Sequence, residues 1–194
     1  MLQKFLTIFI LIIIILCLFS NIIYFSIQNI ENITSTNIIS NLYFPNNEDF
    51  FWPTPGYNNI TSHFGNRISP TTGKPSIHSG IDIGASEGSY IYSVQSGYVS
   101  FVGFNGANGY SIHIENDNYT FIYGHVSPHF KVSKNDYINI GEIIGNIGPK
   151  YVEFSADNPY TDSTGKTTNG STTGPHLHLT IKKDGIAVNP LDLL

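Results

Sequence analysis

The chain has 194 residues, a formal net charge of -5, 41% hydrophobic residues and only 12% charged residues. This composition supports a buried core and excludes wholesale disorder, and the length suits one domain with an accessory segment. Arg67 is the only arginine and the lysines do not cluster, so we expect no nucleic-acid binding, which needs grouped cations. Cys17 is the only cysteine, so any metal site in a single chain must use His, Asp or Glu.

Residues 1–27 are predicted to form an N-terminal transmembrane helix. After Lys4, about twenty mostly apolar residues run from Phe5 to Tyr24, and at ~1.5 Å per residue they span roughly 30 Å, the thickness of the bilayer core. The alternative is a cleaved signal peptide, but the apolar run is long for one and no Ala-x-Ala-like site follows it. Lys4 favours a cytoplasmic N-terminus. We therefore expect a single-pass protein of the cell membrane whose folded domain lies on the extracytoplasmic side.

Residues 28–48 are predicted to be a linker, because they are rich in Asn, Ser, Thr and Ile and have no clean hydrophobic period. The segment Trp52-Pro53-Thr54-Pro55-Gly56 then marks the start of a folded domain, which we assign to 49–194. This division gives an anchor, a short tether and one domain.

The domain is predicted to be all-β, with antiparallel sheets and a sandwich-like core. Short stretches rich in β-branched and aromatic residues alternate with Gly, Asn and Asp turns, at 91–104, 110–116, 119–126 and 176–181. Asn116-Asp117-Asn118 and Asp184-Gly185 are typical of hairpin turns, the second before a strand at 186–188. No segment past residue 50 has an apolar 3.6-residue period over three turns.

Near the C-terminus, the stretch GPHLHL (174–179) has two histidines in an apolar run. Side chains alternate faces along a strand, so His176, His178 and Thr180 share one face while the intervening leucines face the core. The histidine face is then free for a metal or a substrate. Two exposed histidines on a half-solvated sheet are the alternative, and His-x-His alone is weak support for a metal.

Two further segments carry groups suited to metal chemistry. HSGIDIG (78–84) has His78 and Asp82 four apart in a glycine-rich context that does not favour a helix. A loop entering a strand could turn both side chains toward one point, but His-x-x-x-Asp alone is common by chance. Tyr123-Gly124-His125 ends another apolar strand. Imidazole and carboxylate are ligands that zinc accepts, and three such ligands with an open position are the catalytic arrangement. Additional histidines would transfer protons.

In this order, HSGID, YGH and GPHLH resemble the motifs of the lysostaphin-type zinc endopeptidases, which cut the cross-links of bacterial peptidoglycan. Ser62-His63-Phe64-Gly65-Asn66-Arg67, the glycine-spaced run GEIIGNIG (141–148) and Asn189-Pro190-Leu191 also resemble that family. The resemblance covers roughly 50–194, nearly the whole predicted domain.

The resemblance implies a role for five residues. His78, Asp82 and His178 correspond to the ligands of one zinc ion per chain, and His125 and His176 correspond to the two catalytic histidines beside it. It also implies hydrolysis of a peptide bond in a peptidoglycan stem or cross-bridge, with zinc polarising the carbonyl and His125 or His176 taking a proton from water. The roles of the two histidines are not apportioned by the sequence.

Two alternatives to an enzyme stay open. Some lysostaphin-like domains are catalytically silent and act as scaffolds or regulators in cell-envelope complexes, but those domains typically lack ligands or catalytic histidines. Retention of all five residues favours an enzyme here, and a cell-envelope protein partner is compatible with either role. A wall-binding module would have to use the cleft itself, because no separate binding domain is visible.

The chain departs from the family pattern at one insertion, PKYVEFSADNPYTDSTGKTTNG (149–170), which separates the glycine-spaced run from GPHLHL. It is polar and reads as a long loop joined to the strand of His176 and His178. The hypothesis is that it lies at the rim of the cleft and shapes substrate choice, and the alternative is an inert surface loop.

Overall fold

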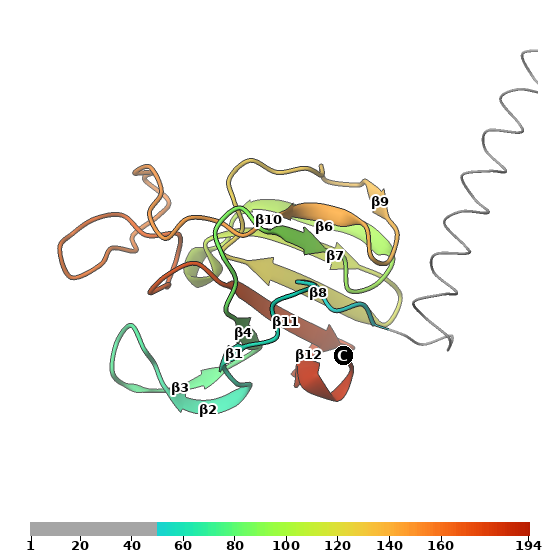
Figure 1. Cartoon of the computed structure of the whole chain (residues 1–194), viewed down its shortest axis with the longest axis horizontal. Helices are drawn as coiled ribbons and strands as arrows, with labels where there is room; N and C mark the ends of the chain where they lie inside the picture. The colour runs from blue at the N-terminus through green and yellow to red at the C-terminus, as the bar shows by residue number, and fades with distance from the viewer. Residues whose placement is uncertain (1–49) are drawn as a thin grey trace, which may run out of the picture. The chain divides into compact units, whose positions relative to one another are not determined.

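The computed structural model describes residues 50–194, and all structural statements concern these residues (Figure 1). The predicted anchor at 1–27 and linker at 28–48 lie outside them. Within the described part, no helix has the length and apolar character needed to cross a membrane. The two helices there are single 3-10 turns, η1 (Gly106–Asn108) and η2 (Pro190–Asp192).

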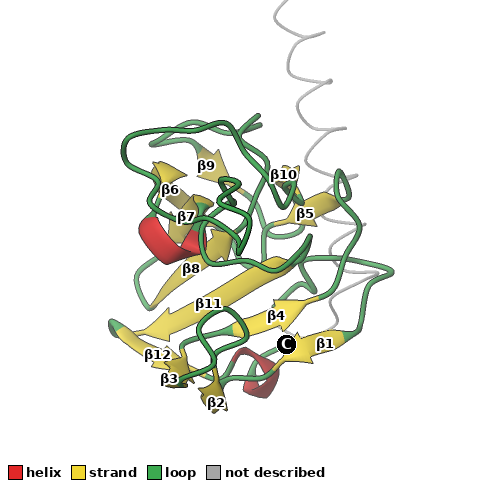
Figure 2. Cartoon of the chain, turned by 90° about the vertical axis from the view of Figure 1, so that its left-hand side faces the viewer, coloured by secondary structure: helices red, strands yellow, loops and turns green. Residues whose placement is uncertain are grey.

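One eight-stranded antiparallel sheet forms the body of the domain. In spatial order its strands are β1 (Ile60–Ser62), β4 (Ile81–Ile83), β11 (Leu177–Lys183), β8 (Tyr119–Gly124), β7 (Tyr110–Glu115), β6 (Gly97–Phe104) and β9 (Tyr137–Ile138), with β12 (Ile186–Val188) also pairing with β11. Figure 2 shows β11 crossing the sheet between β4 and β8. The all-β, antiparallel prediction is confirmed.

Two short ribbons complete the fold. β5 (Tyr90–Tyr92) pairs with β10 (Ile143–Asn146), and β2 (Gly65–Ile68) pairs with β3 (Pro75–His78). Ile91 and Ile144 of the first ribbon are fully buried in the same cluster as the apolar residues of the main sheet. The core therefore has two layers, but the second is a two-stranded ribbon instead of the full second sheet that a sandwich has.

Strand β11 has the alternation that the sequence predicts. Leu177, Leu179 and Ile181 are fully buried in the core. His178 and Thr180, on the opposite face, are buried as well. β4, the neighbour of β11 in the sheet, and the turn before β4 lie close along the edge of β11. A Cβ atom at Gly80 would stand 2.2 Å from the carbonyl oxygen of Leu179, so this approach requires glycine. The rings of His78 and His125 lie beside that of His178, with centres 4.9 Å and 6.1 Å from it, so His178 does not lie on a half-solvated surface.

The hairpin predicted at 116–118 joins β7 to β8, where Asn116 Oδ1 accepts from the N–H groups of Asn118 (3.1 Å) and Tyr119 (2.9 Å). The turn at 184–185 joins β11 to β12. The stretch 91–104, expected to be one strand, is divided between β5 and β6. Polar contacts explain the break, because Ser93 Oγ donates to the carbonyl of Gln95 at 2.7 Å and turns the chain.

Tyr123 links this turn to the sheet. Its side chain is fully buried, and its hydroxyl accepts a hydrogen bond of 2.8 Å from the backbone N–H of Val94. Burial raises the pKa of the Tyr123 phenol well above its ordinary value, so the group stays neutral. The hydroxyl thus satisfies a buried donor that has left the strand ladder.

We expect Tyr123→Phe to lower the free energy of unfolding by about 1–3 kcal/mol, because the Val94 N–H would stay buried without its acceptor. Urea unfolding monitored by circular dichroism measures this change. Tyr98→Phe, at an exposed tyrosine of β6, is the matched control and should change stability by no more than about 0.5 kcal/mol. Equal stability of the two variants would contradict the assignment.

Candidate metal centre and cleft

Strand pairing brings His78, Asp82 and His178 together. In the β4–β11 register, Asp82 lies directly opposite His178. His78 is the last residue of β3, and the turn that follows it leads into β4. Residues almost a hundred positions apart thus meet because two antiparallel strands align them, and all three side chains are buried.

The three facing atoms form a nearly regular triangle. His78 Nε2 lies 3.0 Å from His178 Nδ1 and 3.2 Å from Asp82 Oδ1, and the third side, from His178 Nδ1 to Asp82 Oδ1, is 2.9 Å. In a tetrahedral zinc site with bonds of about 2.0–2.1 Å, neighbouring ligand atoms lie about 3.3 Å apart. The donor set and its spacing therefore fit a zinc-sized cation.

Hydrogen bonds behind the triangle orient each of its members. His78 Nδ1 donates to the carbonyl oxygen of His63 at 2.9 Å, which leaves the lone pair on Nε2. His178 has the opposite arrangement, with Nε2 2.9 Å from the Thr180 hydroxyl and Nδ1 in the triangle. Such outer contacts hold metal-binding rings in one tautomer and orientation.

Arg67 holds the carboxylate in the same way. Its Nη1 atom donates to Ser62 Oγ and, at 3.0 Å, to Asp82 Oδ2, which leaves Oδ1 in the triangle. Burial by itself would raise the pKa of the Asp82 carboxyl, but the polar surroundings supplied by His176, His178 and His78 outweigh it and hold that pKa well below its usual range. Asp82 is therefore ionised.

His125 follows β8 and His176 precedes β11, and their ring centres lie 4.6 Å apart. His125 Nδ1 donates to the carbonyl oxygen of Asn169 at 2.7 Å, and His176 Nδ1 donates to that of Gly174 at 2.8 Å. Both rings therefore keep the Nε2 lone pair. Burial, reinforced by His176 and His178, lowers the pKa of His125 to about 3, so its ring is neutral at pH 7.

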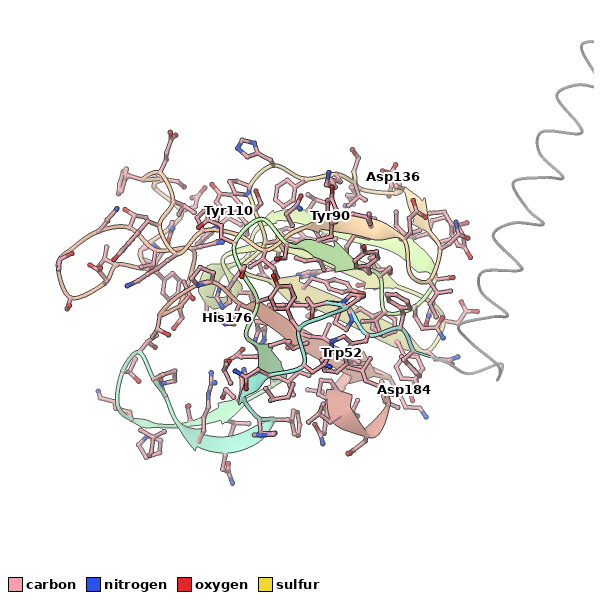
Figure 3. The ribbon with its side chains drawn as sticks, in the orientation of Figure 1. Trp52, Tyr90, Tyr110, Asp136, His176 and Asp184 are labelled. Carbon is pink, nitrogen blue, oxygen red and sulfur yellow. The ribbon has the colours of Figure 1, made fainter. Side chains whose placement is uncertain are left out.

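All five predicted site residues line one open cleft of about 350 Å³. Hydroxyl-bearing side chains also line it, namely Thr61, Ser62, Ser69, Ser76, Ser79, Ser171 and Thr173. The β2–β3 ribbon and the loop over 149–170 extend from the side of the sheet where β11 begins (Figure 1), and Figure 3 places His176 there. A 2.9 Å contact joins Thr71 Oγ1, in the turn between β2 and β3, to the Oγ of Ser171, the residue that follows the loop.

The other histidines do not join this group. The His113 ring packs against Phe101 and hydrogen-bonds Asn105, and the side chain of His129 is exposed. His63 contributes only its backbone carbonyl.

Sequence reasoning did not identify Thr180 and Asn169 as parts of the site. Strand alternation placed Thr180 on the face of His178 and was a usable signal. Nothing local marks Asn169, because its contact with His125 spans 44 positions and uses a backbone carbonyl.

Comparison with known proteins places these features in a family. Residues 76–190, which include all five site residues, match the sequence model of Peptidase family M23. The DD-carboxypeptidase/endopeptidase Mpg of Neisseria meningitidis serogroup B is 30% identical over 138 residues, which are 71% of this chain and 27% of that protein. The chain thus spans about a quarter of the length of this curated relative.

Solved structures share the fold. A zinc-containing peptidase from Vibrio cholerae is 28% identical with a TM-score of 0.57, covering 73% of this chain and 39% of that one. A chain of the SpoIIQ–SpoIIIAH pore-forming complex has the same TM-score of 0.57 over 76% of this chain and 91% of its own, at 20% identity. The second likeness concerns the fold alone.

We expect Thr180→Val to weaken zinc binding about 10–100-fold, because the His178 ring would lose the hydroxyl that fixes its orientation. Competition with a chromogenic chelator measures the affinity. Thr120→Val, an equivalent change on the neighbouring strand β8, should leave it unchanged. Unaltered affinity in Thr180→Val would mean that Thr180 does not orient His178.

Proposed function

Because the chain belongs to peptidase family M23, as its motifs predicted, we propose that it is a zinc metalloendopeptidase that hydrolyses peptide bonds in peptidoglycan stems or cross-bridges. The triangle of Nε2, Oδ1 and Nδ1 atoms, open to a cleft that two more histidines line, is the observation that carries the proposal. The names of the relatives support the reaction class, while the substrate is inferred, since the chain corresponds to only 27% of the curated relative.

In this proposal, His78, Asp82 and His178 hold one zinc ion. When bound, zinc supplies Lewis-acid polarisation of the scissile carbonyl and lowers the pKa of water toward about 7. Two neutral imidazoles and one carboxylate leave the filled site with a net positive charge. Arg67 keeps the carboxylate turned so that only Oδ1 faces the site.

His125 and His176 move the protons. Hydrolysis adds water to the peptide carbonyl and breaks the C–N bond, so one proton must leave the water and one must reach the departing amine. Each ring has its Nδ1–H tied to a backbone carbonyl and its Nε2 lone pair available. Either ring can accept the proton at Nε2 and return it to the amine, and no nucleophilic Ser or Cys takes part.

We also propose that residues 1–27 anchor the chain in the cell membrane and that the enzyme acts outside the cytoplasm. The linker at 28–48, about twenty residues long, reaches no more than roughly 70 Å when extended at ~3.5 Å per residue. The enzyme would then cut wall peptides near the membrane surface, where a cell-envelope protein partner can also reach it.

We expect the zinc-loaded full-length chain to release new amino groups from purified peptidoglycan. His125→Ala and His176→Ala should each slow release by about 100–10,000-fold, because proton transfer is lost, and both should retain zinc. Asp82→Ala should lose zinc and activity together. The control is His129→Ala, an exposed histidine outside the cleft, which should behave as wild type.

A wild-type chain that binds zinc but releases no amine from any type of peptidoglycan would contradict the proposed endopeptidase activity. The scaffold alternative would then account for the fold shared with the SpoIIQ–SpoIIIAH complex. A cellular phenotype that His125→Ala rescues as well as wild type would point the same way.

Alkaline extraction of cell membranes tests the anchor. We expect the full chain to stay in the membrane pellet and a chain without residues 1–27, given a cleavable export signal, to appear in the soluble fraction. A full chain that is extracted at high pH, or that is found shortened in the medium, would contradict membrane anchoring.

A further inference from the structure

Asn169 lies at the end of the insertion over 149–170 and is fully buried. We propose that its side chain is a positioning element for His125, and that the base of the insertion is therefore part of the catalytic scaffold. This inference rests on the proposed function, because His125 needs a fixed ring only if it moves a proton.

Asn169 contacts His125, the residue after it and the start of β7. Its carbonyl oxygen accepts from His125 Nδ1 at 2.7 Å. Its side-chain Oδ1 accepts from the backbone N–H of Tyr110 at 2.8 Å, and its Nδ2 donates to the carbonyl of Val126 at 3.0 Å. The side-chain amide of Asn169 thus links the start of β7 to the residue after His125. It thereby fixes the position of the Asn169 backbone carbonyl that accepts the hydrogen bond from His125 Nδ1.

The backbone of His125 needs such support. Its φ angle is 57°, in the left-handed region that costs a non-glycine residue about 1 kcal/mol or more. Its N–H donates to the carbonyl of Asn108 at 2.7 Å, and its own carbonyl accepts from Gly148 at 2.9 Å. With both backbone groups held, the Nδ1 contact to Asn169 is what fixes the ring.

Close packing leaves no room for Asn169 to shift. A Cβ atom at Gly109 would stand 2.3 Å from both the carbonyl oxygen and the Oδ1 of Asn169, and one at Gly170 would stand 2.3 Å from Gly109 N. The position also needs one donor and one acceptor at once, which an amide supplies and an alanine does not. A residue that filled only the space would leave two buried backbone groups unpaired.

The rest of the insertion is separable from this base. Asn169 N donates to the carbonyl of Lys150 at 2.9 Å, so the chain leaves and returns at the same place. Phe154, between these ends, is 81% exposed. Removing the whole segment would therefore remove Asn169 together with the exposed part, and we expect it to disturb His125.

The first test is the tautomer of His125 in the wild-type, zinc-loaded full chain, read from long-range 15N–1H correlations of the histidine rings. His125→Ala assigns the signal. The proposal expects the proton on Nδ1 and a shifted, exchange-protected Nδ1–H resonance. A proton on Nε2 would overturn it without any variant of Asn169, and this readout does not depend on catalysis.

The second test compares Asn169→Ala with Asn158→Ala. Asn158 is a buried asparagine of the same insertion, whose Nδ2 donates to the carbonyl of Thr168 at 2.8 Å and which does not contact His125. We expect Asn169→Ala to lower kcat about 10–100-fold with KM within about twofold, unchanged zinc content and a weakened Nδ1–H signal. Asn158→Ala should keep kcat within about threefold.

Equal kcat in the two variants, or an unchanged His125 resonance in Asn169→Ala, would overturn the positioning role. An Asn169→Ala chain that fails to fold leaves the wild-type tautomer as the deciding result. If the wild-type chain has no activity, the ring signals of wild type and Asn169→Ala still decide whether Asn169 holds His125, so the two proposals fail separately.

Discussion

The alignment of Asp82 opposite His178 in the β4–β11 pair is the constraint on which the site depends. A shift of one residue in that register would turn one of the two side chains to the other face of the sheet. Three fully buried apolar residues of β11 prevent such a shift, because it would move all of them out of the core. The same packing that stabilises the sheet therefore fixes the distance between two proposed metal ligands.

Backbone carbonyls then decide the chemistry of the histidines. His78, His125 and His176 each donate Nδ1–H to a carbonyl, and each presents Nε2 to the cleft. His178 alone is reversed, because the Thr180 hydroxyl lies beside its Nε2 and leaves Nδ1 for the triangle. The hydrogen bonds on the far side of each ring thus determine whether Nε2 or Nδ1 faces the site, before any metal is bound.

Much of this arrangement follows from local patterns in the sequence. Alternation in HLHLTI separated the core face from the histidine face, and Asn116 and Asp184 marked hairpins because their side chains and backbone suit tight turns. The break between β5 and β6 was missed because the polar turn at 93–96 interrupts an otherwise continuous apolar and aromatic stretch. The motif resemblance, not strand periodicity, supplied the assignment of His78 and Asp82 to one site.

Other features have no local signature. Every residue has a carbonyl, so the sequence cannot mark those of His63, Gly174 and Asn169 as the acceptors for three rings. The approach of Gly80 to Leu179 and the packing of the His78 and His125 rings beside His178 are tertiary contacts, which no local pattern marks. Such contacts can be inferred only once the order of the strands in the sheet is known. They fix the positions of the site residues relative to one another.

Zinc K-edge X-ray absorption on the metal-loaded full chain would test the central claim most directly. The account predicts one tightly held zinc ion with two imidazole nitrogens, one carboxylate oxygen and at least one light-atom ligand from solvent, at about 2.0–2.1 Å and without sulfur. Loss of one imidazole contribution in His178→Ala would agree with it. A six-coordinate, all-oxygen environment, or a chain that retains no zinc, would contradict it.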